Sequence, residues 1–230
     1  LFVNPLQFGP GEDFERYPRD LARDRALAAG RGVTAVFTPD VEVMYPAGSE
    51  TRVVPGPTAE RWEGAMRPGH FTGVLTVVAK LFNLVQPDVA VFGQKDIQQV
   101  TLIRRMVRDL DLPVEILVGP TVREADGLAL SSRNAYLTVA EREQALSLSR
   151  SLRAADTAWR GGEADALRLE SHMRQQFTDA PGVTVDYIAI VHPETLTPVK
   201  RAEHGTVVAV AARAGRTRLL DNLILGMAFR

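Results

Sequence analysis

Two different spacings of apolar residues divide the first half of the chain into strands and helices. Short apolar runs, which are typical of buried parallel strands, occur at residues 33–37, 51–54, 89–92 and 114–118, and residues 1–3 resemble the end of another strand. Apolar residues at helical spacing predict helices at residues 20–29, 58–65, 71–85 and 96–110, and a helical turn at 40–44. Strands that alternate with helices are typical of a parallel, doubly wound sheet.

The pattern changes after Gly119 and Pro120. Thr138 and Glu141 form a capping box, which predicts a long helix to about residue 160 and is followed by a second amphipathic helix. Alternating strands come next, and they are expected at residues 183–191, 207–211 and 218–225, with a hairpin turn at 213–216. We therefore predict an α/β protein with a parallel-sheet domain at residues 1–120 and a small α+β domain at residues 121–230.

A polar cluster lies where the predicted strand at residues 89–92 gives way to the following helix. Gln94, Lys95 and Asp96 come directly after Gly93, which lets the backbone turn sharply or lie close to a ligand. Ligands bind at this end of the strands in open α/β sheets, and a lysine beside helix N-terminal N–H groups favours a phosphate. The chain uses lysine sparingly, with three lysines against 24 arginines. A solvated loop lysine is an equally good interpretation of the local pattern.

Other polar residues are further candidates for a binding site. Ser131, Ser132 and Arg133 combine hydroxyls with forked donors that suit a polyphosphate, although an ordinary interdomain loop explains them better when they are considered alone. Gln7 and Gln99 carry amides, which suit a substrate with hydroxyls and a carboxylate, or they are surface residues.

Composition removes several classes of function. The chain contains no cysteine, which excludes disulfides, a thiol nucleophile and zinc sites with thiolate ligands. The formal net charge of −1 provides no broad basic surface for nucleic acid. No apolar run is long enough for a membrane span, and we expect a cytoplasmic protein. Phosphate-loop and dinucleotide-binding glycine motifs are absent, and the four histidines show no metal-ligand spacing.

Four segments of the chain, taken together, are specific to one enzyme family. They are Phe2-Val3-Asn4-Pro5-Leu6-Gln7-Phe8, Gly93-Gln94-Lys95-Asp96-Ile97-Gln98-Gln99, Val122-Arg123-Glu124-Ala125-Asp126-Gly127-Leu128-Ala129-Leu130-Ser131-Ser132-Arg133-Asn134 and Thr217-Arg218-Leu219-Leu220-Asp221-Asn222. In these segments the chain resembles the pantoate–β-alanine ligases (pantothenate synthetases), and the resemblance follows the order of the chain over nearly its whole length.

The resemblance implies an ATP-dependent, Mg²⁺-requiring ligase of pantothenate biosynthesis. ATP and pantoate would give pantoyl adenylate and pyrophosphate, and the amine of β-alanine would then displace AMP. The fold implied is a Rossmann-like nucleotidylyl transferase domain followed by a lid domain. Family members are typically homodimers, so we expect a homodimer.

The resemblance also implies roles for individual residues. Gln7 and Gln99 would bind pantoate, Gln7 would lie near β-alanine, and residues 9–20 would form a gate over this site. The ATP-binding residues would be Gly93, Gln94 (where the family often has Glu), Lys95, Asp96, Val122 beside the adenine, Leu130 (where Met is more usual), Ser131, Ser132 and Arg133. Lys95, Ser131, Ser132 and Arg133 would act on the phosphates during catalysis. Asn4 and His70 would line the pocket, and Asp24 is a candidate for the Mg²⁺ region.

The chain departs from the family pattern at its N-terminus. The family has a His-x-Gly-His pattern on its first strand and helix, and this pattern is absent here. We expect that the natural protein has a further segment before Leu1. Three alternatives stay open: a short homologue that binds ligand with little or no activity, an enzyme that activates a different acid, and a protein with a purely structural role.

Overall fold

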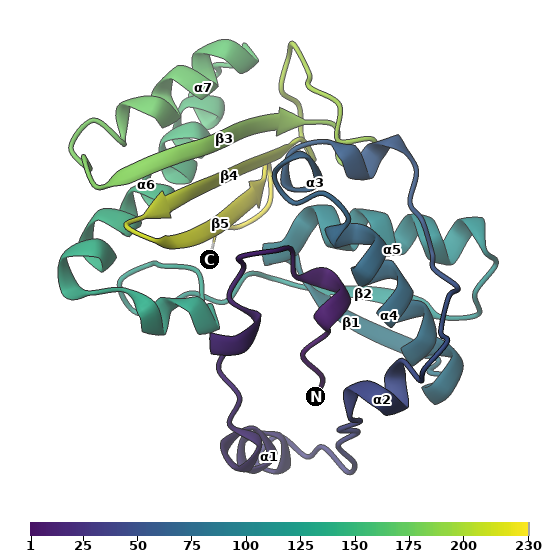
Figure 1. Ribbon diagram of the computed structural model, residues 1–230. Coiled ribbons are helices and arrows are strands. Elements are labelled where there is room, and N and C mark those ends of the chain that lie inside the picture. The colour runs from purple at the N-terminus through teal and green to yellow at the C-terminus, as the bar shows by residue number, and fades with distance from the viewer. Residues whose placement is uncertain (230) are drawn as a thin grey trace.

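The computed structural model describes residues 1–229 and contains two separate sheets (Figure 1). In the first, β1 (Val89–Gly93) pairs in parallel with β2 (Glu115–Gly119), so that Gly93 lies opposite Gly119. The helix α5 (Ile97–Asp109) forms the crossover between these two strands, which parallel pairing requires. The carboxyl end of β1 therefore leads directly into the short turn Gln94–Asp96, which we call the Lys95 turn.

A buried helix supports this sheet and the segment that carries Gln7. The helix α4 (His70–Val85) shares a hydrophobic cluster with α5, and its buried apolar residues are Phe71, Val74, Leu75, Val77 and Val78. A Cβ at Gly73 would overlap the backbone carbonyl of Leu6, so glycine permits the short turn η1 (Pro5–Gln7) to lie directly against α4. This close contact places Gln7 beside the first turn of α4.

The second sheet is antiparallel and has the strand order β3 (Val183–Val191), β4 (Val207–Ala214), β5 (Thr217–Ile224). Figure 1 shows α6 (Val139–Arg160) and α7 (Ala166–Gln175) on the side of this sheet away from α4 and α5. The side chain of Thr138 accepts a hydrogen bond from the backbone N–H of Glu141, which confirms the predicted capping box. The sheet and the two helices enclose a second hydrophobic cluster.

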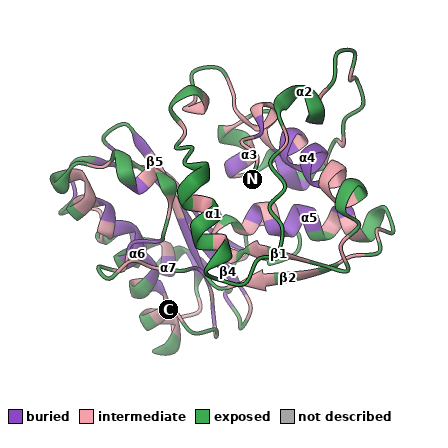
Figure 2. Ribbon diagram, turned by 90° about the horizontal axis from the view of Figure 1, so that it is seen from below, coloured by how far each residue is buried: buried purple, intermediate pink, exposed green. Residues whose placement is uncertain are grey.

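The remaining elements are short or lie at the edges of the molecule. They are η2 (Phe14–Arg16), α1 (Leu21–Ala29), α2 (Val41–Met44), η3 (Pro57–Glu60), α3 (Glu63–Met66), η4 (Gln94–Asp96) and η5 (Ser132–Tyr136). Seen from below, α1 is mostly exposed (Figure 2). None of the helices within residues 1–229 combines the length and apolarity needed to cross a bilayer.

The predicted α/β class is confirmed, but three predicted strands are wrong. Residues 1–3, 33–37 and 51–54 lie outside any strand. Their apolar composition is suitable, but a strand is stable only with a neighbour to complete its hydrogen bonds. The N–H of Val53, for example, donates to the side chain of Thr76 on α4.

The helix predicted at residues 58–65 is also only partly correct. The structure has the turn η3 and the short helix α3 in its place. Trp62, between them, has a φ of 49°, and this left-handed conformation interrupts a right-handed helix.

We propose that the chain forms two domains with a boundary near residue 120. The cluster around α4 and α5 uses buried residues from Met44 to Met106, whereas the cluster around α6 and the second sheet begins at Leu128. A small third cluster brings Trp62 and Ile97 onto the end of β3 and marks the place where the two parts meet.

We predict that Leu152→Ala destabilises the second cluster. Leu152 on α6 is completely buried, so the substitution leaves a cavity and should lower the free energy of unfolding by about 2–5 kcal/mol. Leu167→Ala on α7 is the matched control, because that side chain is 77% exposed and its loss should change stability by less than about 0.5 kcal/mol. Urea unfolding measures both, and equal effects would contradict the described packing.

Candidate active site

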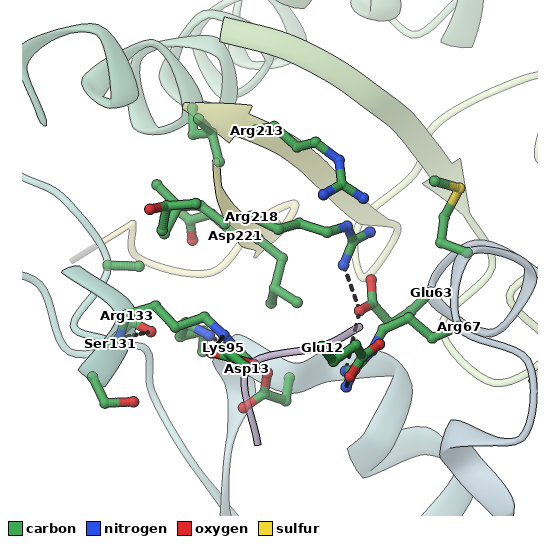
Figure 3. A pocket seen from close by; sticks show the side chains of 18 of the residues that line it. Glu12, Asp13, Glu63, Arg67, Lys95, Ser131, Arg133, Arg213, Arg218 and Asp221 are labelled. Carbon is green, nitrogen blue, oxygen red and sulfur yellow. Dashed lines mark hydrogen bonds and ion pairs between the residues drawn. The ribbon is translucent and has the colours of Figure 1, made fainter. Parts of the chain in front are cut away.

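A cavity of about 890 Å³ lies between the two parts of the molecule (Figure 3). Its walls come from the first 17 residues, from α3 and the start of α4, from the Lys95 turn, from the loop before η5 and from β5. Gln7, Lys95, Gln99 and Arg133, which are distant in the sequence, all line it. Such a concave site with convergent polar groups is where small molecules bind.

The Lys95 turn forms one wall of the cavity. The strand β1 ends at Gly93, η4 covers Gln94–Asp96, and α5 begins at Ile97, so Lys95 stands beside the amino end of a helix. The Lys95 ammonium lies 3.5 Å from a carboxylate oxygen of Asp96, and its side chain is 21% exposed. A cation beside helix N–H groups makes this wall suitable for an anion.

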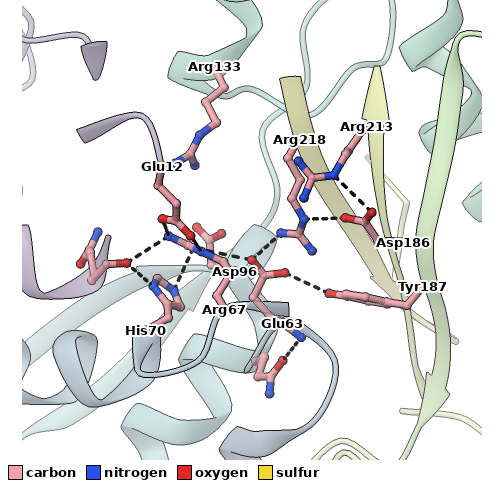
Figure 4. Close-up of polar contacts among 12 residues, drawn as sticks. Glu12, Glu63, Arg67, His70, Asp96, Arg133, Asp186, Tyr187, Arg213 and Arg218 are labelled. Atoms are coloured by element: carbon pink, nitrogen blue, oxygen red, sulfur yellow. Dashed lines mark hydrogen bonds and ion pairs between the residues drawn. The ribbon is translucent and has the colours of Figure 1, made fainter. Parts of the chain in front are cut away.

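Another part of the lining is a hydrogen-bonded corner in which Arg67 and His70 (Figure 4) meet the backbone of Gln7. The backbone carbonyl of Gln7 accepts hydrogen bonds from His70 Nδ1 (2.8 Å) and Arg67 Nη2 (3.1 Å). Arg67 Nη1 lies 3.2 Å from His70 Nε2, and because arginine only donates, Nε2 must accept. His70 is therefore neutral and carries its proton on Nδ1. Burial, together with the charge of Arg67, lowers the pKa of His70 below its usual value of 6.5.

Asn4 lies beneath this corner and is almost fully buried. Its Nδ2 donates to the carbonyl of Gly73 (3.0 Å) and lies 3.4 Å from Gln7 Oε1, while its Oδ1 accepts from the Tyr45 hydroxyl (2.9 Å). Asn4 thus does not line the cavity and instead holds η1 and the Gln7 side chain against α4.

A row of alternating charges crosses the cavity from one part of the molecule to the other (Figure 4). Arg67 binds both carboxylate oxygens of Glu12 and also lies 3.6 Å from Glu63. Arg218 on β5 donates to Glu63 (2.6 Å) and to Asp186 on β3 (2.6 Å). Each charged group therefore has partners of opposite sign on both sides, apart from those at the two ends.

Arg133 is held by a carboxylate of the segment at residues 9–20. Its Nε and Nη2 donate to the two oxygens of Asp13 at 2.9 and 2.8 Å, and the Ser132 hydroxyl donates to the Tyr17 hydroxyl (3.1 Å). Partial burial opposes ionisation of Asp13, but Arg133 outweighs it and lowers the pKa of that carboxyl. Arg133, for which the family resemblance implies a role in binding phosphate, thus fastens this segment to the wall of the cavity.

The structure gathers most of the candidate residues but not all of them. Those that line the cavity are Gln7, His70, Lys95, Asp96, Gln99, Leu130, Ser131, Ser132 and Arg133. Gly93 is outside the cavity lining, Gln94 lines a small separate cavity that also contacts Asn222, and Val122 lines a third cavity of about 560 Å³. Asp24 lies on α1 outside the cavity lining, and within residues 1–229 no three acidic or histidine residues are grouped so that they could hold a metal ion.

Several residues of the site were missed by the sequence analysis. Glu12, Glu63, Arg67 and Arg218 line the cavity, and Asn222 reaches the Lys95 turn. Two signals were available in the sequence: Arg67 lies three residues before His70, and Arg218 and Asn222 belong to the segment Thr217–Asn222. Neither signal shows which side chains these residues contact in the folded protein.

These features define an α/β protein that has a small-molecule cleft, lined by paired charges of both signs, between a parallel and an antiparallel sheet. The chain belongs to the pantoate–β-alanine ligase family, whose model matches residues 1–224. It is 56% identical over 225 residues to pantothenate synthetase from Moorella thermoacetica, a match that spans 98% of this chain and 80% of the relative. It is 57% identical over 227 residues to the enzyme from Thermus thermophilus, with 97% of this chain and 81% of the relative covered.

Solved structures agree with this assignment. A crystal structure of pantothenate synthetase from Thermus thermophilus superposes with a TM-score of 0.94 at 54% identity, covering 97% of this chain and 81% of that one. The pantoate–β-alanine ligase from Francisella tularensis, solved in complex with β,γ-ATP and β-alanine, gives a TM-score of 0.79 at 32% identity and covers 100% of this chain and 79% of that one. The expected family and fold are therefore confirmed.

We predict that His70 makes stability depend on pH. Because its pKa is lowered in the folded state, the unfolded chain binds more protons below pH 6.5, and the free energy of unfolding should fall as the pH drops below this value. His70→Asn should flatten this part of the profile. The carboxyls of Glu12 and Asp13, whose pKa values are also lowered, titrate below this window.

Urea unfolding at pH 7.5 and pH 5.5 measures the effect. His172→Asn, on the exposed side of α7, is the matched control for the removal of a histidine. Parallel profiles for the wild type and His70→Asn would contradict the neutral, buried state of His70.

Proposed function

We propose that this protein condenses pantoate with β-alanine at the expense of ATP and releases pantothenate, AMP and pyrophosphate. The observation that carries the proposal is a single cleft, in a chain of this family, that brings Gln7, Gln99, Lys95 and Arg133 together. The amides suit a hydroxy acid, and the two cations suit a polyphosphate.

The first step is the activation of pantoate. A carboxylate oxygen of pantoate attacks the α-phosphorus of ATP, the bond to the bridging oxygen breaks, and pyrophosphate leaves with the bonding electrons. Lys95 stabilises the negative charge that develops on the phosphates, and Arg133, Ser131 and Ser132 donate to them from the other side. A phosphate that binds Arg133 replaces Asp13 as its partner, so ATP entry loosens the segment at residues 9–20.

Other residues shape the ATP and pantoate subsites. Gln7 and Gln99 hydrogen-bond pantoate, with Asn4 and His70 holding the Gln7 turn in place. Asp96 and Leu130 line the cleft around the triphosphate, and Gly93 and Gln94 shape the turn next to Asp96. Val122 lies beside the adenine if the base extends from the cleft towards the separate cavity that Val122 lines. The hydrogen-bonded corner around Gln7 keeps the carboxylate of pantoate oriented towards the α-phosphorus of ATP.

The second step forms the amide bond. The neutral amine of β-alanine attacks the acyl carbon of pantoyl adenylate, a C–N bond forms, the C–O bond to AMP breaks, and the amine loses a proton. The adenylate is already activated by a good leaving group, so no covalent enzyme nucleophile is needed, in agreement with a chain that has no cysteine.

Mg²⁺ fits this site as a companion of ATP. Mg²⁺ keeps several waters and binds through phosphate oxygens with one or two carboxylates, so it does not require a cluster of protein ligands. Asp96, on the cavity wall beside Lys95, is better placed to contribute a carboxylate than Asp24, which lies outside the cavity lining. When bound, Mg²⁺ neutralises charge on the phosphates.

The oligomeric state and the cellular location are proposed on the basis of the same family membership. We propose a homodimer in the cytoplasm, with small molecules as its ligands. Light scattering that shows a monomer at micromolar concentration would contradict the dimer.

The decisive experiment is the release of AMP by the full-length protein supplied with ATP, Mg²⁺, pantoate and β-alanine. We expect turnover that requires both pantoate and β-alanine. Exchange of pyrophosphate into ATP with other acids in place of pantoate would favour a different adenylating enzyme. Binding of pantoate and ATP by calorimetry without AMP release would favour a binding protein.

We predict that Lys95→Ala slows adenylate formation roughly 100- to 1,000-fold, because it removes a preorganised cation from the developing charge. Pantoate-dependent exchange of pyrophosphate into ATP measures this step. Lys200→Ala is the matched control, since Lys200 is exposed and outside the cavity. An unchanged exchange rate in Lys95→Ala would refute the role of Lys95.

We predict a different kinetic effect for Gln99→Ala. The loss of a hydrogen bond to charged pantoate should raise the KM for pantoate roughly 10-fold or more while the KM for ATP changes little. Gln175→Ala, an exposed glutamine on α7, is the control. If Gln99→Ala instead raised the KM for ATP alone, Gln99 would belong to the nucleotide subsite.

A further inference from the structure

The segment Thr217–Asn222 carries part of the family resemblance but has no role in the mechanism described above. The structure shows where its last residue points. Asn222 on β5 is 1% exposed, and its Nδ2 donates to two consecutive carbonyls, those of Gln94 (3.0 Å) and Lys95 (2.8 Å). One amide nitrogen carries two hydrogens, so both bonds form together. The side chain of Gln94 returns a weaker bond to Asn222 Oδ1 (3.3 Å).

Within residues 1–229, Asn222 provides the side-chain hydrogen bonds that reach the backbone carbonyls of the Lys95 turn. Gly93 has no atom within 4 Å of the place where its Cβ would be, and the Lys95 ammonium has its described ion pair with the next residue, Asp96, at 3.5 Å. The two bonds from Asn222 therefore restrain the backbone of the turn from outside its own sequence neighbourhood.

Asn222 is itself held on a rigid support. Its N–H donates to the carboxylate of Asp221 (2.8 Å), which binds Arg123 through two hydrogen bonds of 2.6 and 3.1 Å. The Arg123 guanidinium lies 4.0 Å from the centre of the Phe229 ring. Because the Asn222 side chain is fixed in this way, the position of β5 determines where the carbonyls of Gln94 and Lys95 lie.

We infer that Asn222 is a positioning residue, which sets the Lys95 turn from the second sheet so that Lys95 meets the phosphates only when the two parts of the molecule are docked. The inference rests on the proposed role of Lys95. The turn comes from residues 94–96 and the restraint from a residue 127 positions away from Lys95, so separation of the two parts would free both carbonyls at once. A misplacement of about 1 Å is enough to reduce a rate roughly 100-fold.

The test is a double-mutant cycle in the full-length protein, with pyrophosphate exchange as the readout. Asn222→Ala should lower kcat roughly 10- to 100-fold with the KM for pantoate changed less than about 2-fold. In the Lys95→Ala background the same substitution should cost less than about 2-fold, since a residue that acts through Lys95 has nothing left to position. Asn222→Asp, which keeps the volume but cannot donate, should behave like Asn222→Ala.

A second measurement separates positioning from a general loss of stability. Amide hydrogen exchange at residues 93–97 should speed up in Asn222→Ala. The control is Leu223→Ala, a buried neighbour on β5 that packs into the second cluster: it should lower the Tm without speeding exchange at the turn or slowing catalysis by the folded protein.

Each outcome decides the inference. It is overturned if Asn222→Ala keeps the wild-type rate, if its loss is the same with and without Lys95, or if Leu223→Ala reproduces both effects. An unchanged rate in Lys95→Ala alone would overturn the proposed function of Lys95 and this inference with it, and that result is distinct from the first three.

Discussion

The guanidinium of Arg218 joins the two parts of the molecule, and the shape of the cleft depends on it. It lies between Glu63 from the first part and Asp186 from the second, and the chain of charges continues through Arg67 to Glu12. The carboxylates of Glu63 and Asp186 are both 7% exposed, and loss of Arg218 would remove the shortest ion pair of each, leaving Glu63 with Arg67 at 3.6 Å and Asp186 with Arg213 at 3.5 Å. Such a row of buried ion pairs contributes little to the net free energy of unfolding. Its main effect is to select one orientation of the first part of the molecule relative to the second.

The same pairing of opposite charges explains how two cations share one cavity. Lys95 and Arg133 come from different parts of the molecule and both line the cleft. Each has a carboxylate partner, Asp96 or Asp13, which offsets the repulsion between like charges. Because Asp13 belongs to a segment outside both sheets, we propose that a phosphate takes its place on Arg133, whereas the ion pairs of Arg218 are built into the second sheet and α3.

Local sequence signals account well for the elements on either side of the Lys95 turn. The apolar run before Gly93 and the helical spacing after Asp96 predicted β1, the turn and α5, and the capping box predicted the start of α6. The predicted strands at residues 33–37 and 51–54 failed, because an apolar run states which residues seek burial but not whether a neighbouring strand is available to pair with them.

The sequence alone was sufficient for the family, the α/β class and the position of the Lys95 turn between a strand and a helix, since these follow from motifs and periods a few residues long. Only the tertiary structure decided that His70 is neutral beneath Gln7, that Arg133 is paired with Asp13, and that Asn222 holds the Lys95 turn. The last two contacts join residues 120 and 127 positions apart. Their formation depends on how two separately packed units dock, and no local period in the chain encodes that arrangement.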